Sequence, residues 1–343
     1  MAARAWLQRL VPLAGLLVLL AVIALLCSTA SVFLERRAML GFIDLAAVVG
    51  LYIFVGNSGV LSFGHVSFMA VGAYTSALLT MRPGMKAMLV PGLPALIAHA
   101  QLSPPLGFVI GALVAAVVAL AVGLILMRLS GMAASIATFA LLIIAYVGLG
   151  NWDSVTGGQK SLMGVPIYSN LRVAFVVAAL SVVIAFAYQE TRSALVLRAA
   201  REDEVAAAAT GVNIYLHRLI AFVLSGFVSG LAGALMAHVL GDVRIETFYL
   251  DLTFMTIAML VIGGSGSLTG AVAGTIVTVA ATEFLRTLEA GLPLGSTGFV
   301  IKAPDGLADS LLALAMLLAL IFFPKGISGG RELAWPVRQP RAR

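Results

Sequence analysis

The chain has 343 residues, of which 61% are hydrophobic and only 10% charged, and its formal net charge at pH 7 is +6. Soluble domains carry about 25% charged residues, so this composition excludes an ordinary soluble protein. The basic residues are scattered between apolar runs and do not form a patch interleaved with aromatics, which excludes a nucleic-acid partner. We attribute the charge to membrane topology and expect membrane lipid to surround the chain.

Apolar runs of about 20 residues recur along the chain, and each is long enough to cross roughly 30 Å of hydrocarbon. Backbone groups in lipid are satisfied within a helix, so these runs predict an all-α polytopic membrane protein. About ten crossing or half-crossing segments are expected. They lie at 10–33, 40–55, 66–81, 106–127, 131–149, 171–189, 218–240, 252–264, 268–287 and 307–323. Residues 1–330 are predicted to be one membrane domain, and 331–343 a short basic cytoplasmic tail.

The first apolar run contains the sole cysteine, Cys27, which can form no intrachain disulfide and makes no metal site alone. The run is long for the core of a signal peptide, so we interpret it as an uncleaved span. The second run carries Asp44 at membrane depth, where an ionisable residue costs about 2.5–3.5 kcal/mol unless it is buried or solvated. We expect an interfacial or structural role for Asp44, and likewise for His238 in the seventh segment.

One sequence pattern occurs twice, each time between two apolar segments. Residues 56–62 read G-N-S-G-V-L-S, and residues 263–269 read G-G-S-G-S-L-T. Paired glycine-interrupted segments predict broken helices, near 56–65 and 263–270, that line a translocation site. The alternative is that the small residues only allow close helix packing. The candidate pathway residues are Asn57, Ser58, Gly59, Ser62, His65, Gly264, Ser265 and Gly266.

Three stretches between the apolar runs are expected to be loops on one side of the membrane. They are the proline-rich 91–105 and 292–306 and the polar 151–170. Alternation of the spans then places the N-terminus and residues 190–217 on the other, cytoplasmic side. The excess of Lys and Arg on that side is small, so the positive-inside rule supports this orientation only weakly.

Residues 189–218 are a polar stretch between two spans, and Glu204–Gly211 within it has the character of a docking helix. The acidic residues at its start suit the helix dipole, the four alanines are strong helix formers, and Gly211 followed by Asn213 is a stop signal. One face, at spacings i, i+3, i+4 and i+7, is almost without side chains. It consists of Glu204, Ala207, Ala208 and Gly211. Such a helix can seat in a groove on a soluble partner.

The sequence contains no catalytic or metal-binding constellation that survives inspection. Gly158–Ser161 resembles the end of a Walker A loop but lacks the required glycine frame. The four histidines are dispersed, with no H-E-x-x-H motif and no cysteine partners. We therefore expect no enzyme activity, no metal and no cofactor. Glu283 and Arg286, three residues apart, are expected to pair on one helix face.

Taken together, these motifs resemble the permease subunits of branched-chain amino acid (LIV-type) ABC importers, specifically the larger of the two permease types. The likeness covers roughly residues 40–330 and is specific only as a set. The stretches that carry it are Gly56-Asn57-Ser58-Gly59-Val60-Leu61-Ser62-Phe63-Gly64-His65 with Gly72-Ala73-Tyr74-Thr75, Ala137-Thr138-Phe139 through Asn151-Trp152-Asp153 to Thr156-Gly157-Gly158, Leu197-Arg198-Ala199 through Glu204 to Gly211-Val212-Asn213, residues 263–270, and Phe323-Pro324-Lys325-Gly326-Ile327.

The resemblance implies a multi-pass subunit of a bacterial inner membrane with four kinds of neighbour. These are a second permease subunit in a heterodimer, two cytoplasmic ATPases, a periplasmic solute-binding protein, and lipid. In this family the Glu-Ala-Ala…Gly loop is the coupling helix that contacts an ATPase. The residues that the resemblance assigns to this contact are Arg198, Glu204, Ala207, Ala208, Gly211 and Asn213.

Departures from the family pattern leave the substrate open. Val60 stands where many members have Gln, Asn57 where they have Tyr, and Ser161 where Gly is usual, while Tyr52 replaces an Asn. Branched-chain or related amino acids are the expected substrates, and urea, amides or organic carboxylates are the alternative. A stand-alone secondary transporter would couple through carboxylates in the bundle core, for which only Asp44 is a candidate. A membrane-embedded enzyme is a third and weaker reading, because it would need a catalytic constellation.

Overall fold

The computed structural model describes residues 2–290, 292–294, 299–301, 306–322, 326–330 and 332. In this part of the chain, 8 helices are long and apolar enough to cross a membrane. The long apolar helices are α1 (Ala2–Thr29), α2 (Val32–Ser58), α6 (Pro104–Leu126), α7 (Gly131–Gly150), α9 (Leu171–Gln189), α12 (Ile214–Leu240), α13 (Leu250–Gly263, preceded by the 3-10 turn η1, Ile245–Phe248) and α14 (Leu268–Ala290). Two shorter apolar helices are α3 (His65–Thr80) and α15 (Leu307–Phe322). Each predicted apolar segment corresponds to one of these helices, which confirms an all-α polytopic membrane protein.

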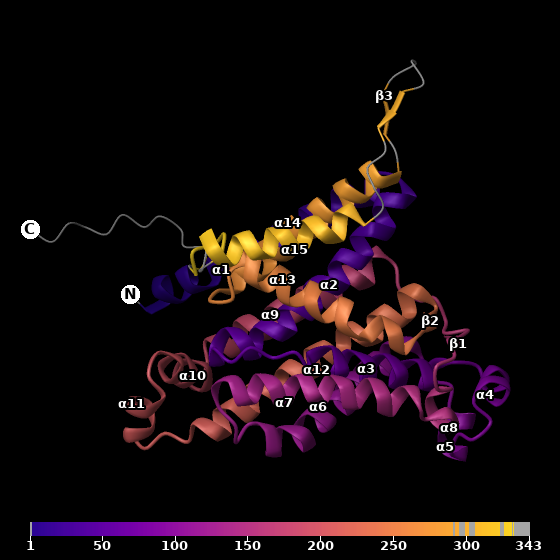
Figure 1. The fold of residues 1–343 in the computed structure, drawn as a ribbon, viewed down its shortest axis with the longest axis horizontal. Coiled ribbons are helices and arrows are strands. Elements are labelled where there is room, and N and C mark those ends of the chain that lie inside the picture. Colours follow the sequence, from indigo (N-terminus) through magenta and orange to yellow (C-terminus); the bar gives the residue numbers. More distant parts are fainter. Residues whose placement is uncertain are drawn as a thin grey trace, which may run out of the picture.

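The remaining elements are short and lie between the long helices. The helices among them are α4 (Pro83–Leu89), α5 (Ala95–His99), α8 (Asp153–Thr156), α10 (Arg192–Glu202) and α11 (Glu204–Ala209). Two antiparallel strand pairs join β1 (Leu162–Met163) to β2 (Asp242–Val243), with Leu162 opposite Val243, and β3 (Leu292–Leu294) to β4 (Phe299–Ile301), with Pro293 opposite Val300. The β1–β2 pair contributes Leu162 and Val243 to the hydrophobic core, whereas β3 and β4 extend away from the helices (Figure 1).

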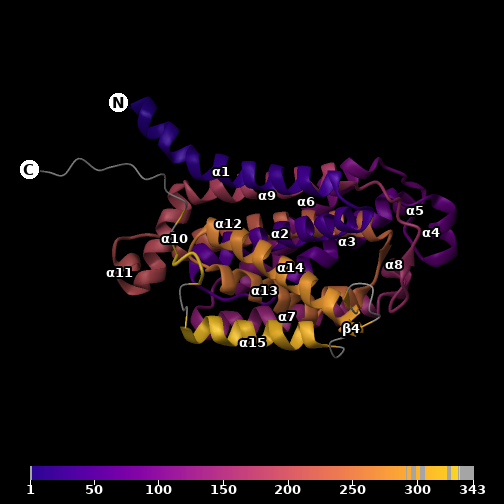
Figure 2. The ribbon, with the colours of Figure 1, turned by 90° about the horizontal axis from the view of Figure 1, so that it is seen from above.

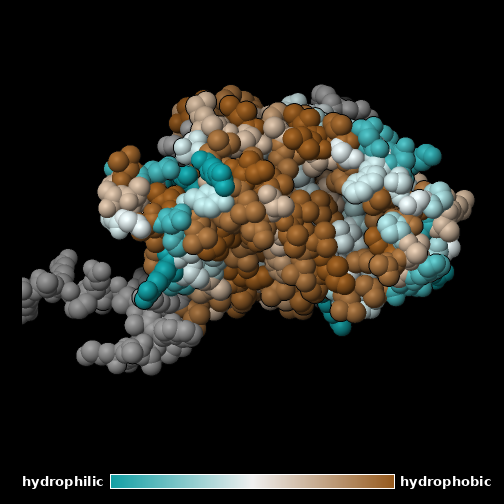
Figure 3. Space-filling model, turned by 90° about the horizontal axis from the view of Figure 1, so that it is seen from below, coloured by the Kyte–Doolittle hydropathy of each residue, from teal (hydrophilic) through white to brown (hydrophobic). Residues whose placement is uncertain are grey.

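The polar elements gather at the two ends of the bundle. α10 and α11 lie at one end, where α1 begins and α15 ends, and α4, α5, α8, β1 and β2 lie at the other (Figure 1). We refer to these as the α10–α11 end and the α4–α5 end. Between them one face is a broad apolar belt, with hydrophilic side chains concentrated at both margins (Figure 3). This is the surface expected of a chain whose middle contacts hydrocarbon.

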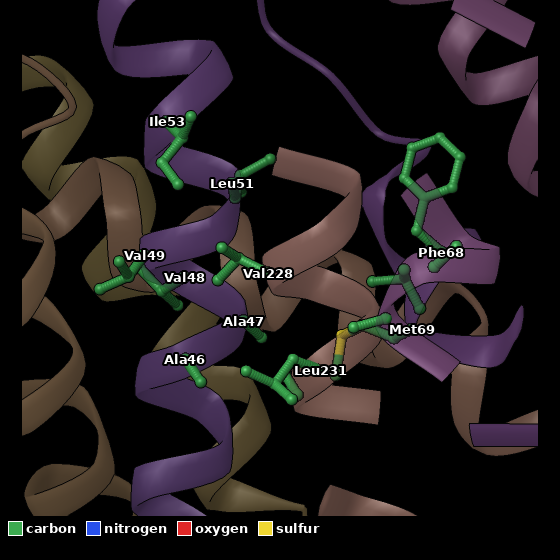
Figure 4. Close-up of a cluster of buried hydrophobic side chains, with 14 of the residues drawn as sticks. Ala46, Ala47, Val48, Val49, Leu51, Ile53, Phe68, Met69, Val228 and Leu231 are labelled. Carbon is green, nitrogen blue, oxygen red and sulfur yellow. The ribbon is translucent and has the colours of Figure 1, made fainter. Parts of the chain in front are cut away.

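The core is built around α12, which packs against α2, α3 and α6. Figure 4 shows side chains of α2, α3 and α12 meeting there, among them Val48, Met69 and Val228, all three of which are buried. α13 and α14 pack together and against α2, and α15 packs on α13 and α14. Seen from above, α1 and α15 follow opposite edges of the molecule (Figure 2).

Glycines bring α3 and α12 into close contact. A Cβ added at Gly72 would lie 2.1 Å from the carbonyl oxygen of Gly230, and one added at Gly233 would lie 2.0 Å from that of Met69. Neither glycine can therefore be replaced without moving a backbone. Close approach of this kind is the usual way in which helices associate inside a membrane, where burial of apolar surface gives little gain.

The α4–α5 end contains a buried cation. Lys86 of α4 is fully buried, and its Nζ donates hydrogen bonds to the carbonyl oxygens of Ile97, at 2.9 Å, and of Ala100. Burial lowers the pKa of Lys86 below its usual 10.5. The side chain thus holds α4 to the chain around α5 and supplies the carbonyl groups there with a donor.

The structure corrects one predicted pair and leaves some predictions outside its range. Glu283 of α14 does not pair with Arg286, because its carboxylate lies 3.2 Å from Nε of Arg37 on α2. The ion-pair partner of Glu283 therefore comes from a neighbouring helix and not from its own helix face. Of the predicted tail, only 332 is described, and 295–298 and 302–305 of the proline-rich 292–306 also lie outside the described residues.

Candidate functional site

Residues 189–218 fold into three helices, each with its own N-cap. Thr191 Oγ1 accepts a hydrogen bond from a backbone N–H of α10. In the same way, Asp203 Oδ1 accepts one from a backbone N–H of α11 at 2.9 Å, and Asn213 Oδ1 accepts one from a backbone N–H of α12 at 3.2 Å. Such caps satisfy N–H groups that a helix start leaves unpaired. Asn213 thus begins α12, and the stop after α11 comes from Gly211 alone, whose φ is +83°.

The short helix α11 lies on the surface of the α10–α11 end. None of its residues is buried, and Val205 is 81% exposed. Of the predicted small-residue face, Glu204, Ala208 and Gly211 are exposed, while Ala207 packs partly on the core. An exposed helix with an apolar side chain at its tip is available to a partner protein.

An ion pair fixes α11 to α12. Oε2 of Glu204 accepts a hydrogen bond from Nη2 of Arg218 at 2.9 Å, and Oε1 accepts one from Nη1 at 3.1 Å. Arg218 is buried, with its side chain 8% exposed, whereas Glu204 is 45% exposed. This two-pronged arrangement is the strongest geometry for a guanidinium and a carboxylate. The predicted docking residue Glu204 is therefore already engaged within the chain.

A groove runs between α10 and α11 on the same surface. It encloses about 490 Å³ and is lined mainly by small and aliphatic side chains of the two helices. Its lining residues are Leu195, Val196, Ala199, Glu202, Asp203, Ala206, Ala207, Thr210 and Val212. Together with the exposed face of α11, the groove gives this end a surface suited to receive a protruding element of another protein.

α10 is attached to α2 and α9 by two arginines on its inner side. Arg198 Nη2 donates to the carbonyl oxygen of Gln189 at 2.6 Å. The side chain of Gln189 in turn accepts a hydrogen bond from the hydroxyl of Tyr52 on α2, at 3.1 Å. Arg201 Nη1 donates to the carbonyl oxygen of Gly56 at 2.9 Å. Arg198 was predicted as an ATPase contact, and Tyr52 is one of the departures from the family pattern. Both residues are hydrogen-bonded to Gln189.

The two G-x-S-G-x-L motifs both interrupt helices, but at different motif positions. α2 continues through Ser58 and ends at Gly59, whose φ is +71°. α13 ends at Gly263, and Gly264 has a φ of +111°. α2 runs longer because its polar residues bond to their own helix: Asn57 Nδ2 donates to Ile53 O at 3.0 Å, as does Ser58 Oγ to Phe54 O at 2.7 Å.

Each interruption joins two helices that run in opposite directions. α13 and α14 cross closely, since a Cβ on Gly274 would lie 2.1 Å from the carbonyl oxygen of Met259. Residues 59–64 connect α2 to α3 and lie on α7, where Ser135 Oγ donates to Leu61 O at 2.7 Å and Phe63 N donates to Thr138 Oγ1 at 3.2 Å. The motifs therefore form the turns that connect α2 to α3 and α13 to α14, and only the second turn joins two helices that pack closely on each other.

The two turns meet beneath α10. A Cβ added at Gly56 would lie 2.8 Å from the carbonyl oxygen of Ser265. Between them lies a cavity of about 240 Å³, into which Arg201 projects from α10. Its lining residues are Val55, Gly59, Leu61, Arg201, Leu260, Val261 and Ser265. Of the predicted pathway residues, Gly59 and Ser265 are brought together here, with Gly266 beside the same guanidinium.

The other predicted pathway residues lie elsewhere. Asn57, Ser58, Ser62 and Gly264 are buried in the packing around the two turns. His65 begins α3 and is enclosed by Phe54, Phe68 and Phe222, with ring centroids 5.7, 5.9 and 5.6 Å away. Neither of its ring nitrogens has a hydrogen-bond partner among the described residues. Whether His65 contacts a solute stays a prediction.

Two functional candidates were missed from the sequence. Arg201 and Arg218 lie within the polar 189–218 stretch, but nothing in their spacing distinguishes them from neighbouring arginines. Their partners, Gly56 and Glu204, are brought to them only by the folding of α10 and α11 onto the bundle. Amphipathic spacing in α10 is the one signal that could have indicated an inward-facing arginine.

Comparison with known proteins identifies the family. The family described as "Branched-chain amino acid transport system / permease component" matches residues 33–321. The chain belongs to this family of permease components. The permease is thereby a multi-pass protein of the inner (plasma) membrane, as its apolar spans indicate.

Individual relatives share moderate identity with the permease. It is 29% identical over 287 residues to the high-affinity branched-chain amino acid transport system permease protein LivM of Escherichia coli K12, an alignment covering 73% of this chain and 63% of LivM. It is 28% identical over 272 residues to LivM of Salmonella typhimurium LT2, covering 69% and 60%. It is 26% identical over 296 residues to the probable branched-chain amino acid transport permease protein LivH of Methanocaldococcus jannaschii, covering 82% and 87%.

The alignments cover different shares of the relatives' lengths. The permease aligns with only about three fifths of the length of the two LivM proteins, but with most of the LivH protein. No solved structure was found to match the chain.

Proposed function

We propose that this permease is the transmembrane subunit of an ATP-driven solute importer, and that separate ATPase subunits dock on residues 198–213. The observation that carries the proposal is α11, an exposed helix that is locked to a spanning helix by the Glu204–Arg218 pair. A partner that moves α11 therefore moves α12 with it. The permease family membership supplies the class of process.

Transport by such a subunit requires no chemistry in the chain itself. The α10–α11 groove would receive an element of the ATPase, and nucleotide-dependent movement of the ATPases would bias the bundle between outward-open and inward-open arrangements. A second permease subunit in a heterodimer would complete the translocation path, and a periplasmic solute-binding protein would deliver the solute to the α4–α5 end. The coupling residues of the proposal are Arg198, Glu204, Ala207, Ala208, Gly211 and Asn213, as predicted from the sequence.

Branched-chain or related amino acids are the substrates we propose, because the LivM and LivH relatives are described as branched-chain amino acid permeases. Urea, amides and organic carboxylates remain the alternative, since the family departures at Val60 and Asn57 lie at the first turn. Tyr52 carries less weight for the substrate, because its hydroxyl is occupied by Gln189.

The test is to purify the complex through a tag on this chain and reconstitute it with its binding protein in liposomes. ATP-dependent accumulation of leucine, isoleucine or valine supports the proposal, and accumulation of only urea, an amide or another carboxylate selects the alternative. Uptake that follows a proton or sodium gradient without ATP would overturn it in favour of a secondary transporter. A ligand screen of the binding protein by thermal shift identifies the solute independently.

A further inference from the structure

We propose that the cavity between the two glycine–serine turns is a binding site for the carboxylate of a small aliphatic acid, with Arg201 as the carboxylate-binding residue. This inference rests on the proposed transport function and deepens it by naming a solute contact at the α10–α11 end. It follows from the composition of the cavity and from the position of the guanidinium.

The cavity combines one cation with an aliphatic wall. Val55, Leu260 and Val261 supply branched aliphatic side chains from α2 and α13, and Ser265 supplies a hydroxyl from the second turn. The volume, about 240 Å³, is suited to a small organic molecule and lies below the range of drug-sized sites. An aliphatic group and a carboxylate are the two ends of a branched-chain acid, and both find a counterpart here.

The guanidinium of Arg201 retains donors for a ligand. One nitrogen, Nη1, donates to the carbonyl oxygen of Gly56 at 2.9 Å, which fixes the side chain over the first turn. The carboxylate of Glu202 lies 4.0 Å from Nε, at the limit of an ion pair, and is itself 82% exposed. A guanidinium has five N–H donors in a planar fork that matches a carboxylate. Arg201 can therefore keep its structural bond and still bind an acid.

Access to the cavity is open on the α10–α11 side. Gly59 and Arg201 are exposed and Ser265 is half-buried, whereas Val55 and Leu260 are buried. A solute would thus reach the guanidinium from the side on which α11 lies, with its aliphatic part directed inward. Glycine is required at this entrance, because a Cβ at Gly59 would lie 2.6 Å from Cγ of Arg201.

The experiment uses protection of an introduced thiol from a maleimide reagent. Ser265→Cys in a Cys27→Ser background places one reactive group of this chain in the cavity, and Val261→Cys gives a second reporter. The probes are leucine, 4-methylpentanoate, which lacks the amine, and leucinamide, which lacks the carboxylate. The tagged complex is labelled in inside-out vesicles, and modification is read on the peptide of this chain.

Leucine and 4-methylpentanoate are expected to slow labelling, by about threefold when the probe concentration is twice its dissociation constant. Leucinamide is expected not to protect. Arg201→Met is expected to abolish protection, and the matched control Arg192→Met, which removes an exposed arginine from the same helix, is expected to preserve it.

Protection by leucinamide equal to that by leucine, no protection by either acid, or protection that survives Arg201→Met would each overturn the proposal. If Arg201→Met fails to assemble, the comparison of 4-methylpentanoate with leucinamide still decides. A complex that accumulates leucine with ATP while the thiol stays unprotected removes this site but leaves the transport function standing. A thiol that is protected in a complex without ATP-driven uptake would support this site and contradict the proposed transport function.

Discussion

The carboxylate of Glu204 and the guanidinium of Arg218 form a two-pronged ion pair, with hydrogen bonds of 2.9 and 3.1 Å, across the junction of α11 and α12. The pair has one buried member and one half-exposed member. It therefore holds a surface helix in a defined position while leaving that helix accessible.

Reversing the charge of Glu204 is expected to uncouple ATP hydrolysis from uptake while the complex still assembles. Glu204→Lys places an ammonium against a buried guanidinium, at a local cost on the order of 2 kcal/mol, or about a 30-fold shift toward a detached α11. Substrate-stimulated ATP hydrolysis and uptake by the reconstituted complex measure the effect. Arg192→Glu, a charge reversal at an exposed residue of α10 outside the groove, is the control and is expected to have a smaller effect.

The charge-swapped pair separates the two roles open to Glu204. Glu204→Arg combined with Arg218→Glu is expected to restore part of the uptake that either change removes, because the attraction between α11 and α12 is re-formed. An assembled double variant that stays as inactive as the single ones would mean that the carboxylate acts directly on the partner.

Replacing His65 by phenylalanine is expected to preserve stability and uptake. The imidazole lies among three phenylalanine rings, and its nitrogens find no partner in the described part of the chain. His65→Ala leaves a cavity and is expected to cost about 2–4 kcal/mol of stability, so reduced uptake by that variant alone is uninformative. A stable His65→Phe variant that no longer transports would place the imidazole in the solute pathway.

Gly233→Ala is expected to disrupt the contact between α3 and α12. The added methyl would meet the backbone of Met69, and overpacking of this kind costs about 1–3 kcal/mol or more. Yield and melting temperature of the detergent-solubilised protein measure it. Gly148→Ala on α7, with nothing within 4 Å of the new methyl, is the control and is expected to be neutral or slightly stabilising. Equal stability of the two variants would contradict the close crossing.

The α4–α5 end is expected to become more stable as the pH rises toward 10.5. Burial lowers the pKa of Lys86 in the folded protein below the value of 10.5 that it has when exposed. Between these two values the unfolded segment binds more protons than the folded one, so raising the pH favours the folded segment. Below the lowered pKa the cost of burying the charged form is fully present.

Limited proteolysis within residues 82–103 at several pH values reads this effect. Lys86→Met is expected to remove the pH dependence and to accelerate cleavage at every pH, because the carbonyl groups of Ile97 and Ala100 lose their donor, at about 1–3 kcal/mol. Cleavage of the wild type that does not slow as the pH rises would contradict a buried lysine.

Hydropathy predicted the helices of the bundle but not their ends. The segment predicted at 40–55 is a helix from Val32 to Ser58. It extends at its start because Ser31 caps it and Arg37 has an ion-pair partner, and at its end because Asn57 bonds to its own backbone. Polar side chains that are satisfied in this way do not end a helix, and a hydropathy window cannot detect it.

The candidate site was predicted in part. The docking helix begins at Glu204 as expected and ends within two residues of Gly211, because the helix signals there are local. The repeated motifs were recognised from the sequence. Although both share the pattern G-x-S-G-x-L, α2 ends at the third motif position, Ser58, and α13 ends at the first, Gly263. The contact of Arg201 with Gly56 spans 145 residues of sequence, and no local pattern encodes it.

Arg201 and Glu204 are separated by only two residues, yet they are tied to different helices. The first is bonded to the end of α2 and the second to the start of α12, and α2 and α12 run in opposite directions through the core. The two residues between them are too few to let the two contacts move independently. In the proposed coupling, a force on α11 would therefore shift α2 and α12 relative to each other along their lengths.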